Sequence, residues 1–405
     1  MNRKQFGILI VLLVVLGGAG WLVQRAHNRA AGAGEQGAGR KLLGDSFPIN
    51  EVAHISIKQG ADEVNLVKKD DVWRVRERKD YPANFSQISE FLMKAADLKV
   101  VQTEDVGASQ LPRLQLATGQ GTNSGTVVDL KNKDDKSIKT LMLGKKLMGK
   151  SQQAQQFAFD GEFPEGRYVM VGGNDKQALL IADPLANIEP KVEQWLDKAF
   201  FKIERPKAVA VAYPGALGTN SWKIVRDTES GDWKLADAKA GEKLDAARAS
   251  DVSSPFASPT FNDVLLPGGA TDATGLDKPT VVTVDTFDDL TYTVNIGSKK
   301  DDAYCLTMKV VTKFPKERVL TKDEKPEDKA KADKAWAERL KQIEEKVEQT
   351  KKFENWTYLV PTWNVDPILK NRKDLLEVKK DEKAQAKADT SGLPNPEDII
   401  GPGAK

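Results

Sequence analysis

The chain has 405 residues, of which 61 are Lys or Arg, 59 are Asp or Glu and 40% are hydrophobic. This length predicts two or three domains with cores of their own, and the balance of interspersed charges excludes the clustered cations of a nucleic-acid-binding protein. A single cysteine, Cys305, excludes an intrachain disulfide, and its place in a strand-like run predicts a buried thiol that acts as a small hydrophobe.

The first element in the chain is an apolar run at residues 6–23, preceded by Arg3 and Lys4. A helix of this length measures about 27 Å, close to the ~30 Å of a bilayer's hydrocarbon core. We expect a single-pass anchor in the inner (cytoplasmic) membrane, with residues 1–5 cytoplasmic, a flexible spacer at 24–44 and an extracytoplasmic or periplasmic body. A cleaved signal peptide is the competing interpretation, and the sequence leaves cleavage open.

Residues 45–200 form the first predicted module. Short β-like runs lead into a helix with Asn84 as its N-cap, and a hairpin turns at the paired aspartates Asp134 and Asp135. Further strands and a second helix, at 184–200, complete the module. Aspartate tolerates turn geometry, whereas a calcium loop needs more oxygen ligands at fixed spacing, so we place the paired aspartates in a turn.

A second module, residues 201–378, repeats the first at a shift of 154 positions, as from Thr126 to Thr280. It has its own, less apolar helix around 244–253. The other matches between the modules are Asp134-Asp135 with Asp288-Asp289, Gly144 with Gly297, Phe163-Pro-x-x-Arg167 with Phe314-Pro-x-x-Arg318, and Asn187-Ile-Glu-Pro with Asn364-Val-Asp-Pro. The repeat identifies a duplicated scaffold and no chemistry.

An insertion lengthens the second module, and its composition predicts a helix at 326–350 that begins at Pro326. This helix is highly charged apart from a narrow apolar seam of Trp336, Leu340, Ile343 and Val347. Two interpretations stay open: the seam packs on its own module, or it is a partner-docking surface. We expect residues 379–405 to be a disordered tail.

Catalytic motifs are missing from the chain. It has no Gly-rich phosphate loop and no Gly-x-Ser-x-Gly elbow. Its two histidines, His27 and His54, provide neither a zinc site nor a Ser-His-Asp triad, and His54 in the first strand is interpreted as structural. We therefore predict no catalytic, cofactor-binding or metal-binding residues and no enzymatic activity.

Taken together, these features resemble the DUF4340 family of bacterial envelope proteins, in tandem copies over residues 45–375. The resemblance rests on the anchor, on Phe47 to Ile57, on Leu66-x6-Trp73, on Phe91-Leu92 and on Trp195 to Phe201. The family has no assigned activity. The resemblance implies an accessory role beside ABC-type export systems. The expected fold is α+β: an N-terminal transmembrane helix followed by two related, mostly antiparallel sheet modules with flanking helices.

Two functions from different classes follow as expectations. The first is a non-enzymatic, membrane-anchored extracytoplasmic interaction protein, auxiliary to ABC transporter components. The alternative is a periplasmic module that binds glycan or peptidoglycan through tryptophans, namely Trp222, Trp233, Trp356 or Trp363. The sequence does not indicate the ligand, the oligomeric state or the relative orientation of the modules.

Overall fold

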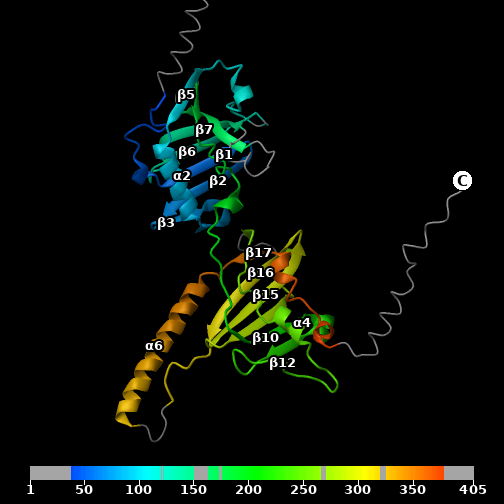
Figure 1. The fold of residues 1–405 in the computed structure, drawn as a ribbon. Coiled ribbons are helices and arrows are strands. Elements are labelled where there is room, and N and C mark those ends of the chain that lie inside the picture. Colours follow the sequence, from blue (N-terminus) through cyan, green and yellow to red (C-terminus); the bar gives the residue numbers. More distant parts are fainter. Residues whose placement is uncertain are drawn as a thin grey trace, which may run out of the picture. The chain divides into compact units, whose positions relative to one another are not determined.

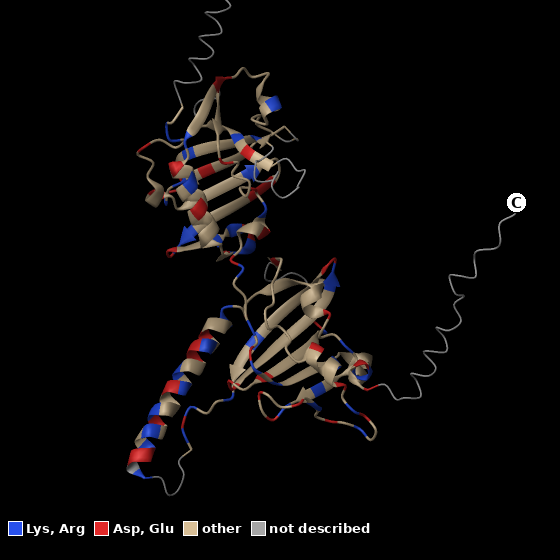
Figure 2. Cartoon of the chain, in the orientation of Figure 1, with Lys and Arg blue, Asp and Glu red and all other residues tan. Residues whose placement is uncertain are grey.

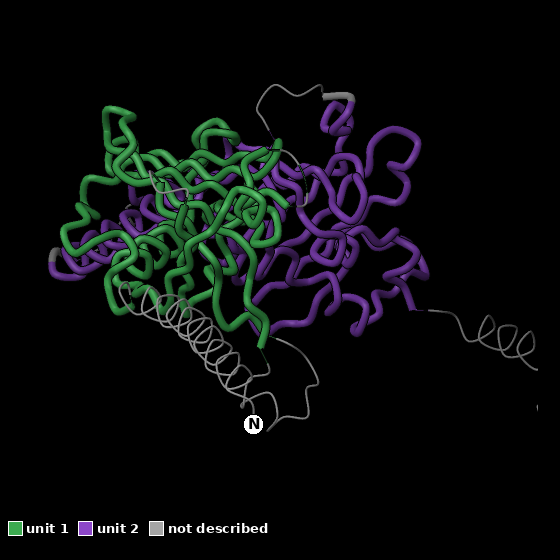
Figure 3. The backbone as a smooth tube through the Cα atoms, turned by 90° about the horizontal axis from the view of Figure 1, so that it is seen from above, with its two compact units in different colours: residues 1–197 green, residues 198–405 purple. Residues whose placement is uncertain are grey.

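The computed structural model describes residues 38–119, 121, 123–149, 163–172, 176–265, 271–319 and 325–377 (Figure 1). The chain divides into two compact units, Met1–Asp197 and Lys198–Lys405 (Figure 3), close to the expected boundary between residues 200 and 201. The predicted anchor at 6–23 and the tail at 379–405 lie outside the described residues. Within the described part, no helix combines the length and the apolar character that a membrane span requires.

Unit 1 is built on one antiparallel sheet with the strand order β4-β3-β2-β1-β6-β7-β8-β9-β5. Its strands are β1 (His54–Gln59), β2 (Asp62–Lys69), β3 (Val72–Val75), β4 (Tyr81–Pro82), β5 (Val100–Asp105), β6 (Thr126–Lys131), β7 (Ser137–Gly149), β8 (Phe163–Val171) and β9 (Gln177–Ile181). Its helical segments are η1 (Ile49–Glu51), η2 (Arg76–Arg78), α2 (Phe85–Asp97), η3 (Leu111–Leu114) and η4 (Val192–Trp195).

Unit 2 has a second antiparallel sheet with the order β12-β11-β10-β14-β15-β16-β17-β13. Its strands are β10 (Pro206–Ala212), β11 (Trp222–Val225), β12 (Lys234–Leu235), β13 (Asp263–Leu265), β14 (Thr280–Thr286), β15 (Leu290–Lys300), β16 (Ala303–Thr312) and β17 (Thr357–Pro361). Its helical segments are η5 (Gly215–Asn220), α4 (Ala246–Val252), α5 (Thr271–Thr274), α6 (Pro326–Lys351), α7 (Thr362–Val365) and η6 (Arg372–Leu375).

The two sheets share one topology. Apart from the two-residue β4, each strand of unit 1 has a counterpart at the same place in unit 2, and the registers agree: Ile57 pairs with Val128, and Val211 pairs with Val282. The predicted duplication is therefore a duplication of topology and register. Both units are mostly β with few helices, which fits the α+β class only in a broad sense.

α2 in unit 1 and α4 in unit 2 begin in the same way. Asn84 caps α2 by accepting from the Gln87 amide at 3.1 Å, as predicted, and Asp245 caps α4 by accepting from the amides of Ala247 and Arg248. The backbone N–H of each cap residue also donates to the end of its unit, Asn84 to the Trp195 carbonyl at 2.8 Å and Asp245 to the Leu375 carbonyl at 2.9 Å. These bonds join the helix start to the last turn of each unit.

Two details of the sequence prediction are wrong. The segment 184–200 is irregular apart from η4, although its apolar spacing suits a helix. Pro190 lies in its middle, where it removes an amide donor and turns the preceding residue away from helical geometry, and the Trp195 indole instead donates to the Glu189 carbonyl at 2.9 Å.

The pairing of Phe163 with Phe314 is also wrong. Phe163 begins β8, whereas Phe314 follows the end of β16. By register the counterpart of Arg167 is Tyr304, because Lys146 pairs with Arg167 and Lys299 pairs with Tyr304 at the same place in the two sheets. The shared Phe-Pro-x-x-Arg letters therefore do not mark equivalent positions.

Candidate functional site

α6 is the feature that most distinguishes unit 2 from unit 1. It spans Pro326–Lys351, 26 residues, one residue beyond the helix expected at 326–350, with Glu327 and Asp328 in its first turn and Lys351 in its last. Acids at the start and a base at the end complement the helix dipole. The helix extends beside the sheet of unit 2, and charges of both signs alternate along it (Figures 1 and 2).

The predicted seam faces the sheet of its own unit over part of its length. Ile343 and Val347 are buried, with exposed fractions of 5% and 7%, whereas Leu340 and Trp336 are half-buried. The Trp336 ring lies on Phe314, with centroids 4.3 Å apart and an interplanar angle of 31°. Of the two open interpretations, the structure thus favours packing on the same module, because the two covered side chains are not exposed to a partner.

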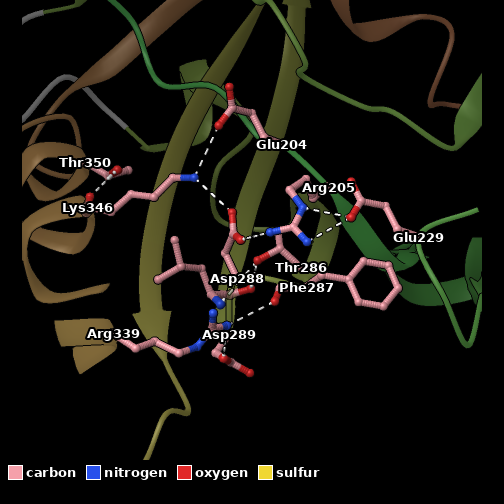
Figure 4. Close-up of polar contacts among 11 residues, drawn as sticks. Glu204, Arg205, Glu229, Thr286, Phe287, Asp288, Asp289, Arg339, Lys346 and Thr350 are labelled. Carbon is pink, nitrogen blue, oxygen red and sulfur yellow. Dashed lines mark hydrogen bonds and ion pairs between the residues drawn. The ribbon is translucent and has the colours of Figure 1, made fainter. Parts of the chain in front are cut away.

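The turn between β14 and β15 supplies the polar half of the α6 contact. Asp289 adopts a left-handed conformation with φ 62°, as Asp135 does in unit 1, which confirms the predicted turn. Lys346 of α6 lies 3.1 Å from Asp288 and 3.2 Å from Glu204, and Arg339 lies 2.7 Å from Asp289 (Figure 4). Burial is the largest single influence on Lys346 and lowers its pKa, but the hydrogen bonds and charges of Asp288 and Glu204 together outweigh it and raise the pKa.

The network continues away from the helix through Arg205. Its guanidinium bonds Asp288 at 2.5 Å and Glu229 at 2.8 Å, and the bond with Glu229 raises the pKa of Arg205 and lowers that of Glu229 (Figure 4). Acids and bases therefore alternate from Glu229 through Arg205, Asp288 and Lys346 to Glu204. These contacts join α6 to the turn between β14 and β15 and to the segment before β10.

Unit 1 uses the equivalent aspartate differently. Asp135 accepts from Nδ1 of His54 at 2.5 Å, and Nε2 of the same ring faces Asn65 Oδ1 at 2.8 Å. His54 is 3% exposed, in agreement with the predicted structural role, and its hydrogen bond is the main cause of the lowered pKa of Asp135. Ala208 takes the place of His54 in unit 2, where α6 supplies the partner of the aspartate instead.

The sequence does not reveal this use of the turn. Local patterns identify the paired aspartates as turn formers, but their contacts with Arg339 and Lys346 join residues 50 and 58 positions apart. One weak signal exists in the sequence, since the module with the inserted charged helix also has Ala208 where the first module has His54.

The four tryptophans proposed for ligand binding do not form a platform in unit 2. Trp222 is 3% exposed, and its indole donates to the Lys370 carbonyl at 2.7 Å. Trp233 is half-buried under the Arg226 guanidinium, 4.7 Å from the ring centroid, Trp356 is half-buried, and Trp363 is 63% exposed. Their unequal burial gives the glycan-binding alternative no support.

The single cysteine lies in the core of unit 2. Cys305 is 1% exposed, and burial raises the pKa of its thiol, which fits the predicted small hydrophobe. Among the described residues, no cluster of three or more His, Cys, Asp or Glu side chains has the geometry to hold a metal ion.

Comparison with known proteins gives one family. A family model described as a domain of unknown function, DUF4340, matches residues 73–279, from β3 of unit 1 to the residue before β14 of unit 2. No curated protein and no solved structure matches the chain.

Proposed function

We propose that this chain, which belongs to the DUF4340 family, is a non-enzymatic interaction protein of the cell envelope that presents α6 to a protein partner. The partner in this proposal is a component of an ABC-type transport system. The proposal also retains the membrane anchor at residues 6–23 and an extracytoplasmic body, both of which rest on the sequence.

One observation carries the proposal: α6 is held on one side and exposed on the other. Ile343, Val347 and the ion pairs of Lys346 and Arg339 hold the helix, while Glu338 and Glu345 on the opposite side are exposed. A surface of fixed geometry with charges of both signs suits recognition of a complementary charged protein surface, because charge pairs at an interface give specificity and steer encounter.

Cysteine cross-linking tests this proposal, because Cys305 is buried and an introduced surface cysteine becomes the reactive one. Glu338→Cys and Glu345→Cys, labelled with a heterobifunctional cross-linker in intact cells, should each yield a covalent product that contains a transporter component. Met93→Cys, at an exposed position of α2 in unit 1, is the matched control. The proposal fails if the two α6 variants give the same products as Met93→Cys.

A further inference from the structure

A hollow of about 370 Å³ lies in unit 1 between the first described segment of the chain and the inner face of the sheet. Its apolar lining consists of Leu42 and Leu179, which are 4% and 3% exposed, and of Val171, which is half-buried. Arg40, Lys41 and Lys139 lie around it, and Asp45 is the single acidic residue of its lining. The hollow therefore combines a small apolar lining with a basic rim.

The register of the two sheets identifies the equivalent place in unit 2. Lys139 pairs with Leu130 as Tyr292 pairs with Val284, so Lys139 and Tyr292 are counterparts. By the same comparison Val171 corresponds to Met308 and Leu179 to Tyr358. The three counterparts in unit 2 are at most 2% exposed, whereas Lys139 and Val171 are half-buried.

The end of α6 covers these positions in unit 2. The Tyr292 hydroxyl lies beside Thr350 and Lys346 of α6. Just after the helix, Phe353 packs on Phe200, whose ring in turn lies 4.6 Å from Tyr358. The place that is hollow in unit 1 is thus occupied in unit 2 by an amphipathic helix of the same chain.

In unit 1, residues of the segment 40–45 line this place, and the connection that carries α6 in unit 2 is short. α6 belongs to the connection from β16 to β17, and the corresponding connection in unit 1 runs only from Val171 to Gln177. A connection of this length is too short for a helix such as α6, because one helical turn already uses about four residues. A helix that covers the hollow therefore does not come from this connection.

The rim indicates the charge of such a helix. Lys41 pairs with Asp97 at 2.9 Å, whereas the ion pairs of the described residues include neither Arg40 nor Lys139. Two cations beside an apolar lining favour a ligand that brings carboxylates next to an apolar side chain.

We propose that this hollow docks an acidic, amphipathic helical segment of a partner protein, in the position that α6 occupies on unit 2. The interface is distinct from the exposed side of α6 and does not depend on the function proposed above. The apolar residues of the segment cover the half-buried Val171, and its carboxylates bind Arg40 and Lys139.

Two peptides of opposite charge test the proposal against the full-length chain. Both copy residues 340–350 of α6 and keep its Leu340, Ile343 and Val347. The acidic peptide carries Lys341→Glu and Lys346→Glu, and the basic peptide carries Glu344→Lys, Glu345→Lys and Glu348→Lys. By fluorescence anisotropy, the acidic peptide should bind saturably with one site per chain and at least about tenfold more tightly than the basic one.

Variants of the chain locate the binding. Lys139→Glu should remove the preference for the acidic peptide, whereas Lys133→Glu, the same charge change at an exposed position of the same hairpin, should leave it intact. If Lys139→Glu unfolds unit 1, Arg40→Glu replaces it in this test, because Arg40 lies at an exposed position. Three outcomes would each overturn the proposal that the hollow binds an acidic segment of a partner protein. The two peptides could bind equally, or the preference for the acidic peptide could survive Lys139→Glu. The third is that the chain self-associates and that Lys139→Glu dissociates it.

Discussion

At the residue scale, single side chains close each unit by meeting partners far away in the chain. Arg372 is 7% exposed and donates to Glu242 at 2.7 Å, to the Asp237 carboxylate at 2.9 Å and to the Asp237 carbonyl at 2.8 Å. This guanidinium fastens the irregular segment before α4 to the last turn of unit 2. The bonds from Arg372 are also the main reason that the pKa of Glu242 falls to about 2.

This shift predicts a defined dependence of stability on pH. The pKa of Glu242 in the folded chain, about 2, lies below that of an unfolded glutamate, about 4.3. Its contribution to stability is therefore fully present above about pH 4.3 and is lost as the pH falls toward 2. We expect Glu242→Gln to lower Tm at pH 7 and to approach the wild-type Tm at pH 3, in thermal unfolding by circular dichroism.

Glu348→Gln is the control for this measurement, since its carboxylate is mostly exposed and its ion pair among the described residues is with Lys351 on the surface. It should leave Tm nearly unchanged at both pH values. A Tm difference for Glu242→Gln that stays constant from pH 7 to pH 3 would contradict the assigned pKa.

Glycine is required at one equivalent position of the two units. A Cβ on Gly144 would lie 2.4 Å from the Leu114 carbonyl oxygen, and a Cβ on Gly297 would lie 2.1 Å from that of Thr274. In each unit a helical turn, η3 or α5, approaches the sheet there so closely that no side chain fits. Steric exclusion thus explains why the repeat matches glycine with glycine.

We therefore predict that Gly144→Ala and Gly297→Ala each lower the free energy of unfolding by about 1–3 kcal/mol, the usual cost of overpacking. Gly107→Ala and Gly218→Ala are the controls, because a Cβ at either position would meet nothing closer than 3.8 Å. Urea denaturation of the four variants checks this. Equal effects at tight and open positions would show that the close approach is absent in solution.

At the scale of elements, α6 compensates for a short helix. α2 has 13 residues and buries Ile88, Phe91, Leu92 and Ala95, whereas α4 has 7 residues and buries only Ala249 and Val252. α6 packs on β16, the strand that corresponds to β8, and contributes Ile343 and Val347 to the core. The sheet of unit 2 thus receives from an inserted helix apolar cover that α4 does not provide.

The packing of Ile343 against the sheet predicts how a substitution at this position changes the detachment of α6 from the sheet. Ile343→Ala removes a buried side chain, with an expected loss of about 2 kcal/mol of docking energy, which corresponds to roughly 30-fold faster amide exchange in α6. Hydrogen exchange followed by mass spectrometry should show this increase in peptides from α6, and a smaller one in β14 and β15.

Gln342→Ala, at an exposed neighbouring position of the same helix, is the matched control and should leave the exchange of α6 unchanged. If Ile343→Ala also leaves it unchanged, the seam does not hold the helix.

At the scale of the whole molecule, each unit has its own sheet and its own core. In the described part of the chain, the strands of each sheet pair within their own unit. The hydrogen bonds from the cap residues to Trp195 and Leu375 close each unit at its own end. Each unit is large enough to fold as a domain, because it has its own contacts between residues far apart in the chain.

We predict that residues 38–197 and residues 198–377 each fold when produced alone. Each fragment should unfold in one cooperative transition by circular dichroism and give dispersed amide resonances in NMR spectra. As a control, a fragment that ends within unit 1 at Gly144 should not fold, because it lacks β8 and β9. An unfolded 198–377 fragment would refute the independence of the second unit.

The sequence by itself determined the duplication, most of the strands, the Asn84 cap, the aspartate turns and the extent of α6. All of these follow from local patterns, namely periodicity, capping and turn chemistry, that a few neighbouring residues define. Only the tertiary structure decided that the seam of α6 faces its own sheet, that Asp288 and Asp289 hold it, and that the same place is hollow in unit 1. These features depend on side chains brought together from distant segments, and neither burial nor an ion pair is a property of the local sequence.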